Sequence, residues 1–201
     1  MSNRLGRVEG FDADRYLVDQ LVRPIANLYR ITPLAAGASP AGPPVAYVSE
    51  ARPADGADIR FYADEQETED LFQIKARNVL DLGGSRCDVY AGERQIGALE
   101  HRTSRVRSTW YIRDASNQEL AVARERSLLM AIVRRLPGIG GLGPISTNFD
   151  LRIDGKVIGR LDGKLPLRDR CVLDVSGDRE HRLDRRLAVA LVIGLDALEN
   201  R

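Results

Sequence analysis

Cysteine and histidine are scarce in this sequence, with two residues of each among 201. Cys87 and Cys171 are too few to form a disulfide framework, and neither has the spacing of a metal ligand. His101 and His181 each lack a second ligand at the spacing of a metal site. We therefore expect no metal and no cofactor.

The sequence also lacks a long hydrophobic run. The longest, residues 187–195, covers nine residues including one glycine, whereas a membrane-spanning helix needs roughly 20. Residues 1–15 contain no apolar stretch, so they are not a signal peptide, and we expect a flexible lead-in there. The net charge of +1 gives no reason to expect a nucleic-acid partner. These absences favour a cytoplasmic protein, with peripheral attachment to a membrane as an open alternative.

Enzyme signatures are missing as well. The sequence has no G-x-S-x-G, no cysteine–histidine pair and no paired-carboxylate motif. Residues 138–143 match G-x-G-x-x-G, but Pro137 and Pro144 flank them and a strand pattern follows instead of a helix. A phosphate-binding loop needs a strand before it and a helix N-terminus within it. We interpret the glycines as a loop and expect no enzyme.

Short alternating segments are what the chain has in abundance. Apolar and polar residues alternate, with β-branched and aromatic residues, as they do in half-buried strands. Strands are predicted over residues 16–22, 28–31, 45–48, 59–62, 71–76 and 170–175. The proline- and glycine-rich residues 33–44 predict a loop. Residues 127–136 fit a helix or a strand equally well.

A strand–turn–strand unit occurs three times, at residues 88–99, 110–122 and 149–161. The third turn, Asp154–Gly155 between alternating runs, is a strong hairpin signal. Each returning strand places a small residue after a branched aliphatic one, as in Ile96–Gly97 and Ile158–Gly159. A glycine inside a strand often marks a bulge or a close backbone approach. Repetition of one hairpin predicts an antiparallel barrel.

The C-terminal segment predicts a helix over residues 184–198, with Asp184 as its N-cap. No polar stripe interrupts residues 187–195, and a helix that is apolar all round must be buried on every side. A closed sheet around the helix provides such burial, with four aliphatic residues as its core: Leu187, Leu191, Val192 and Leu195. We therefore predict a mainly β protein, one domain over residues 16–201, with a barrel closed around its own helix.

The sequence resembles the branch of the tubby-like superfamily that holds the plant LURP-one-related proteins and the phospholipid scramblases, small bacterial members above all. The resemblance covers nearly the whole chain and is carried by diffuse structural patterns. The segments are 16–20 (YLVDQ), 61–65 (FYADE), 72–77 (FQIKAR), 107–110 (RSTW), 125–127 (ERS), 134–135 (RR), 167–170 (LRDR) and 183–191 (LDRRLAVAL).

The resemblance implies a barrel of about twelve strands around a buried C-terminal helix. Together with the missing enzyme motifs, it favours a non-catalytic binding or scaffold domain of unknown ligand and unknown partner. The alternative, which the arginine-rich middle segment motivates, is a peripheral membrane protein that binds anionic phospholipid or phosphoinositide head groups. The cysteine cluster and the closing acidic loop of scramblases are absent, since Asp174, Asp178 and Glu180 do not match a calcium loop. Lipid scrambling with the helix in a bilayer therefore ranks last.

Arginine supplies nearly all the positive charge, because only Lys75, Lys156 and Lys164 are lysine. Residues 101–135 hold eight arginines against three acidic residues, and residues 53–73 hold seven acidic residues against one arginine. One hypothesis is a basic face for phosphate or anionic lipid head groups. Its candidates are Arg102, Arg105, Arg107, Arg124, Arg126, Arg134 and Arg135. The alternative, which we favour, is that the two segments are neighbouring strands that pair their charges. Residues 167–170 and 183–186 are interpreted as ion-pair clusters at a barrel rim.

Overall fold

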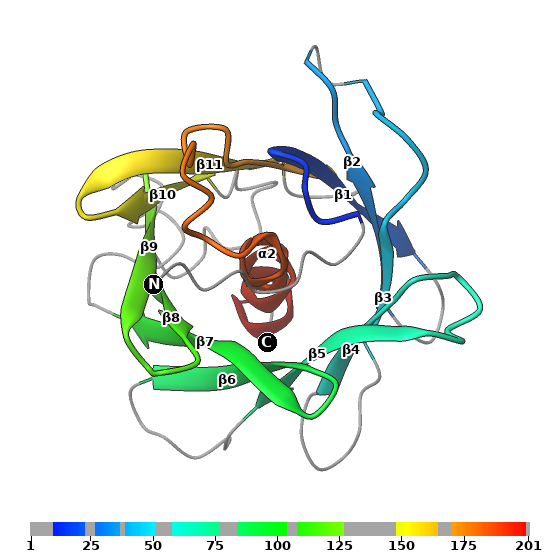
Figure 1. The fold of residues 1–201 in the computed structure, drawn as a ribbon, viewed down its shortest axis with the longest axis horizontal. Helices are drawn as coiled ribbons and strands as arrows, with labels where there is room; N and C mark the ends of the chain where they lie inside the picture. Colours follow the sequence, from blue (N-terminus) through cyan, green and yellow to red (C-terminus); the bar gives the residue numbers. More distant parts are fainter. Residues whose placement is uncertain are drawn as a thin grey trace, which may run out of the picture.

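The computed structural model describes residues 10–22, 27–36, 39–50, 58–76, 84–103, 108–126, 148–164 and 170–199. Within these ranges the chain forms twelve strands and one helix (Figure 1). They are β1 (Arg15–Val22), β2 (Asn27–Pro33), β3 (Ala46–Glu50), β4 (Asp58–Tyr62), β5 (Asp70–Ala76), β6 (Gly84–Ala91), β7 (Arg94–Thr103), β8 (Ser108–Asp114), β9 (Glu119–Glu125), β10 (Asn148–Ile153), β11 (Lys156–Lys164), β12 (Arg170–Asp174) and α2 (Arg185–Glu199).

The strands form a closed antiparallel barrel, as the sequence predicted. Each strand pairs with its neighbours in the chain, and β12 pairs with β1 so that no edge remains between them. Side chains alternate between the two faces of a strand, and β10 shows this plainly. Phe149, Leu151 and Ile153 are buried inside, whereas Asp150 and Arg152 lie on the outer face and are partly exposed.

Helix α2 fills the interior of the barrel (Figure 1). Every residue from 185 to 195 is buried, including the four predicted core residues Leu187, Leu191, Val192 and Leu195. Asp184 caps the helix, because its Oδ1 accepts the backbone N–H of Arg186 at 2.9 Å. The prediction of a helix buried on all sides is confirmed, and it explains why the run of aliphatic residues has no polar stripe.

The three predicted hairpins share one irregularity. In each, the register shifts by one residue on the returning strand, which is a β-bulge. The skipped residues are Ile96, Leu120 and Ile158, and the small residues that follow them are Gly97, Ala121 and Gly159.

Gly97 also meets the prediction of a close backbone approach. A Cβ there would lie 2.5 Å from the carbonyl oxygen of Arg113 and 2.8 Å from Cδ1 of Leu187 on α2. Both distances are shorter than a carbon atom tolerates. The bulge therefore brings the barrel wall against the central helix at a point where only glycine fits.

Phe11 is a correction to the expected lead-in of residues 1–15. Its side chain is 6% exposed, and its ring lies 5.5 Å from that of Phe72 on β5. The ordered core therefore begins before β1. Residues 1–9, the ambiguous segment 127–136 and the glycine-rich residues 138–143 lie outside the described residues.

Candidate functional site

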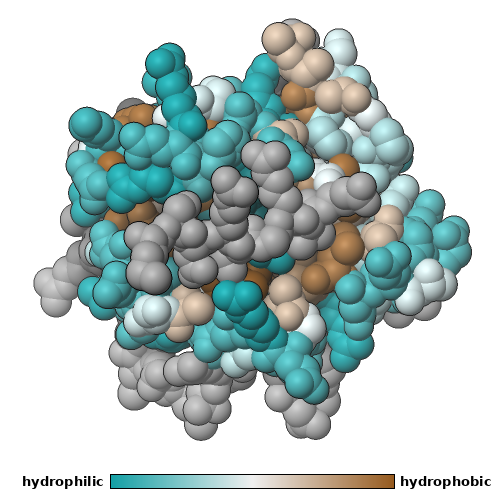
Figure 2. Space-filling model, viewed as in Figure 1, coloured by the Kyte–Doolittle hydropathy of each residue, from teal (hydrophilic) through white to brown (hydrophobic). Residues whose placement is uncertain are grey.

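The outer surface of the described residues offers polar groups and few apolar ones. Seen down the barrel axis, hydrophilic side chains cover most of the rim (Figure 2). Among the described residues, Val157 is the sole large hydrophobic side chain that is well exposed, at 42%. An apolar docking surface therefore has no basis in this part of the chain, and the arginine-rich surface becomes the candidate.

Arg102 is the first of three anion-binding candidates that the structure describes, with Arg124 and Arg126. It is exposed on β7, its Nε lies 2.6 Å from Oε1 of Glu100, and its guanidinium lies 4.9 Å from the ring centre of Tyr111. Arg113 holds the other oxygen of Glu100 at 2.7 Å. Burial raises the pKa of Glu100, but the hydrogen bonds from Arg113 and Arg102 outweigh it and keep that pKa below its usual value.

Arg102 is therefore engaged in an ion-pair cluster. Four other candidates lie outside the described residues: Arg105, Arg107, Arg134 and Arg135.

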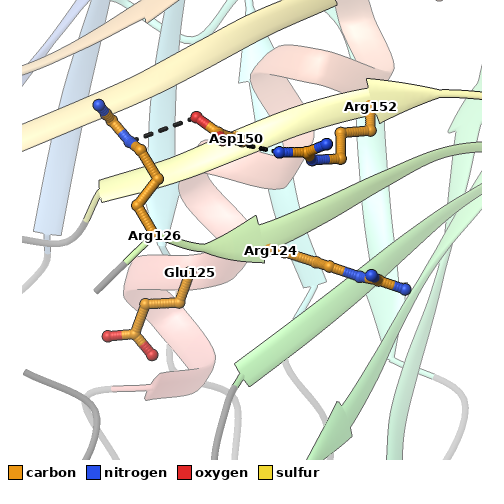
Figure 3. A pocket seen from close by; sticks show the side chains of 5 residues that line it. All are labelled: Arg124, Glu125, Arg126, Asp150 and Arg152. Carbon is orange, nitrogen blue, oxygen red and sulfur yellow. Dashed lines mark hydrogen bonds and ion pairs between the residues drawn. The ribbon is translucent and has the colours of Figure 1, made fainter. Parts of the chain in front are cut away.

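Two further candidates from the sequence, Arg124 and Arg126, do come together in a surface hollow. Arg124 is on β9 and Arg126 follows directly after it, so alternation puts both on the outer face and turns Glu125 inward. Across the strand pair, Arg152 of β10 joins them, and the hollow has a volume of about 170 Å³. Its lining residues are Arg124, Glu125, Arg126, Asp150 and Arg152 (Figure 3).

Asp150 is the shared counter-ion of this hollow. Its Oδ2 accepts a hydrogen bond from Arg152 at 3.2 Å. Its Oδ1 lies 3.4 Å from Nε of Arg126 and 3.9 Å from Nε of Arg160 on β11. Figure 3 shows Asp150 between Arg126 and Arg152, with one interaction to each. Three guanidinium groups therefore share one carboxylate, while Arg126 also pairs with Asp162.

Arg124 differs from its neighbours in this hollow. It is exposed, and it makes no ion pair within the described part of the chain. In Figure 3 its side chain points away from Asp150, along the outer face. A guanidinium in this state presents its donors to solvent and can bind an oxyanion without first breaking an ion pair.

Asp150 and Arg152 were missed as candidates at the sequence level. Alternation in the predicted strand 149–153 already assigns both side chains to the outer face. What the sequence lacks is the register that pairs Asp150 with Arg124 on one side and with Arg160 on the other. Those pairings join positions far apart in the chain, so no local sequence motif predicts them.

The favoured alternative, in which the acidic and basic segments are neighbouring strands, is wrong for the described residues. The acidic residues lie on β4, β5 and the turn between them, whereas the basic residues begin at the end of β7. Strand β6 lies between β5 and β7 in the barrel. The arginines instead find their partners on β7, as Arg102 and Arg113 do, or on β10 and β11, as Arg126 does.

The predicted ion-pair cluster over residues 183–186 is present and buried. Side chains of Arg185 and Asp178 are 4% and 2% exposed and lie 2.7 Å apart. Burial raises the pKa of Asp178, but the N–H groups of Leu183 and Arg182 and the Arg185 guanidinium outweigh it and hold the pKa below its usual value. Arg185 also reaches Asp14 at 2.9 Å. This cluster ties the start of α2 to the segments that follow β12 and precede β1.

The second predicted rim cluster, residues 167–170, is described only at Arg170, which pairs with Asp19 at 2.9 Å. Burial raises the pKa of the nearby core residue Tyr16 above its usual value.

Nε2 of His101 lies 3.0 Å from the Ser108 hydroxyl, and its ring stacks on Trp110. Within the described ranges, no group of three or more histidine, cysteine or acidic residues could hold a metal ion.

Comparison with known proteins gives no relative for this chain: it matches no family model, no curated protein and no solved structure. Within the described residues, no helix has both the length and the hydrophobicity needed to cross a membrane. A functional proposal therefore depends on the geometry of the arginine hollow.

Proposed function

We propose that this protein is a non-catalytic binding domain whose outer surface takes up a phosphate-bearing anionic group at the hollow between β9 and β10. The observation that carries the proposal is the grouping of Arg124, Arg126 and Arg152 around about 170 Å³ of open space with one shared outer-face carboxylate, Asp150. The resemblance to lipid-associated families points to the same chemistry, with an anionic lipid head group as one source of the phosphate.

Arginine suits this role better than lysine would. The guanidinium is planar and always charged, and its fork of N–H donors matches two oxygens of a phosphate at once. Arg124 is free of ion pairs among the described residues and would make the first contact. Arg126 and Arg152 line the same hollow, where both contact Asp150.

Vesicle flotation of the whole protein tests this proposal. One set of vesicles is phosphatidylcholine alone, and the other also contains phosphatidylserine, each at low and at physiological salt. We expect binding to the anionic vesicles that weakens as salt rises, because salt screens exposed charges. Competition with inorganic phosphate then separates a soluble phosphate ligand from a lipid head group.

Arg124→Gln supplies the site-specific arm of the experiment. We expect about fivefold weaker binding, since one basic residue near an anionic surface contributes about 1 kcal/mol. The matched control is Arg94→Gln, which removes an equal charge from an exposed position of β7 and should change binding much less. Equal losses from both variants would refute the site. No binding to vesicles or phosphate would refute the function and direct the search to protein partners.

A further inference from the structure

The carboxylate of Asp150 occupies the centre of the arginine hollow. Its two oxygens face different guanidinium groups, Oδ2 toward Arg152 at 3.2 Å and Oδ1 toward Arg126 at 3.4 Å. Arg160 approaches Oδ1 from β11 at 3.9 Å. A phosphate that engaged the same arginines would place its oxygens where these carboxylate oxygens now lie.

We propose that Asp150 is a built-in competitor of the anionic ligand. Its carboxylate pairs with the arginines when no ligand is bound, and this lowers the affinity of the hollow for the ligand. This inference rests on the proposed function, since it concerns regulation of the same hollow. Binding would require the ligand to displace Asp150 from Arg126, while Arg124 holds the incoming anion from the open side.

The contacts of Asp150 Oδ1 with the arginines are weak enough for a ligand to displace this oxygen. Oδ1 is buried, yet it makes no hydrogen bond among the described residues, and its contacts with Arg126 and Arg160 are ion pairs only. Such contacts leave guanidinium N–H donors without well-aligned acceptors, and a phosphate with its several oxygens could satisfy them better.

Asp162 is a second counter-ion of Arg126, and it accepts a hydrogen bond from the Arg126 guanidinium at the exposed face of β11. It pairs with Arg126, and its side chain is 55% exposed. An exposed ion pair contributes little to stability, so its removal should leave the barrel intact. Asp162 therefore provides a second and structurally milder way to release Arg126.

The test measures the affinity of Asp150→Asn for phosphatidylserine-containing vesicles and for inorganic phosphate. Asparagine keeps the shape of the side chain and removes its charge. We expect about fivefold tighter binding. Two unit charges 4 Å apart in water interact with about 1 kcal/mol, and this energy corresponds to about a fivefold change in affinity. Asp162→Asn should shift affinity in the same direction by a smaller factor. Thermal unfolding checks that each variant is folded.

Glu93→Gln is the control for net charge, because it makes the same change at an exposed turn position. Tighter binding by Asp150→Asn but not by Glu93→Gln supports the competitor. Where Asp150→Asn does not fold, tighter binding by Asp162→Asn but not by Glu93→Gln supports it. An equal gain in Glu93→Gln refutes it. Wild-type binding that Asp150→Asn leaves unchanged or weakens also refutes it, while the proposed function stands. If no form binds vesicles or phosphate, both proposals fail.

Discussion

Asp178→Asn should destabilise the barrel strongly, although the residue is far from the arginine hollow in the sequence. The Asp178 side chain is 2% exposed, and its carboxylate accepts three hydrogen bonds in the buried cluster at the start of α2. The donors are the N–H of Arg182 at 3.0 Å, the N–H of Leu183 at 3.0 Å and Nη1 of Arg185 at 2.7 Å. Nη2 of Arg185 also reaches the backbone carbonyl of Asp178 at 3.4 Å. Asparagine removes the charge and one acceptor oxygen, and it turns an amide N–H₂ toward donors.

The size of the effect follows from what Arg185 loses. Breaking a buried ion pair by removing one partner costs about 3–5 kcal/mol, because the remaining charge stays buried. Arg185 keeps its contact with Asp14 at 2.9 Å, and Asp14 is 49% exposed, so compensation is partial and we expect the lower end, about 3 kcal/mol. At roughly 2–4 °C per kcal/mol for a chain of this size, Tm should fall by about 6–12 °C.

The pH dependence checks the same reasoning independently. The pKa of Asp178 is lower in the folded protein than its ordinary value of 3.8. A carboxyl with a depressed folded pKa contributes stability that is fully present above the unfolded pKa and is lost as pH falls through the folded pKa. The stability gap between wild type and Asp178→Asn should therefore be largest near neutral pH and shrink below about pH 4.

Thermal and urea unfolding at neutral pH and in acid measure both effects. Asp154→Asn is the matched control, because Asp154 forms an exposed pair with Arg182, with side chains 73% and 48% exposed. That variant should unfold at nearly the wild-type temperature. The reasoning fails if Asp178→Asn is as stable as this control, or if its deficit persists unchanged in acid.

Two other substitutions test the fit of α2 in the barrel. Gly97→Ala should cost about 1–3 kcal/mol in unfolding free energy, because its Cβ would lie 2.5 Å from a backbone oxygen, whereas Gly42→Ala meets no atom within 4 Å and should be neutral. Leu191→Asp should give no folded barrel by circular dichroism, since Leu191 is 0% exposed and the carboxylate would be buried unpaired. Soluble, folded Leu191→Asp with a wild-type unfolding curve would contradict the buried helix.

The sequence carried most of the fold because the local signals agreed with one another. Alternation predicted the strands to within a few residues, and an apolar helix with no polar stripe required an enclosure on all sides. The glycines of two returning strands indicated a bulge or a close backbone approach, and Gly97 shows both. Phe11 escaped because a single aromatic residue in a polar segment has no periodicity, and its burial depends on the distant ring of Phe72.

The candidate site was less accessible to sequence reasoning. Arginine abundance pointed to residues 101–135 as a whole, but composition cannot say which arginines lack a partner. Arg102 is held by Glu100, two residues away, whereas Arg124 has no ion pair among the described residues. That difference depends on strand register and rotamers, which a charge count does not contain. The pairing of acidic and basic segments failed for the same reason, because strand order was unknown.

Filling the barrel with α2 decides where recognition can occur in the described residues. The inner positions of β10, such as Phe149 and Leu151, are 0% exposed and pack in the core, so they cannot receive a ligand without unfolding the interior. The outer positions, Asp150 and Arg152, alternate with them on the same strand. The packed inner face therefore fixes the strand register that places the outer charges next to one another. The proposed competition between Asp150 and a phosphate would thus take place between side chains whose backbone positions are held by the core.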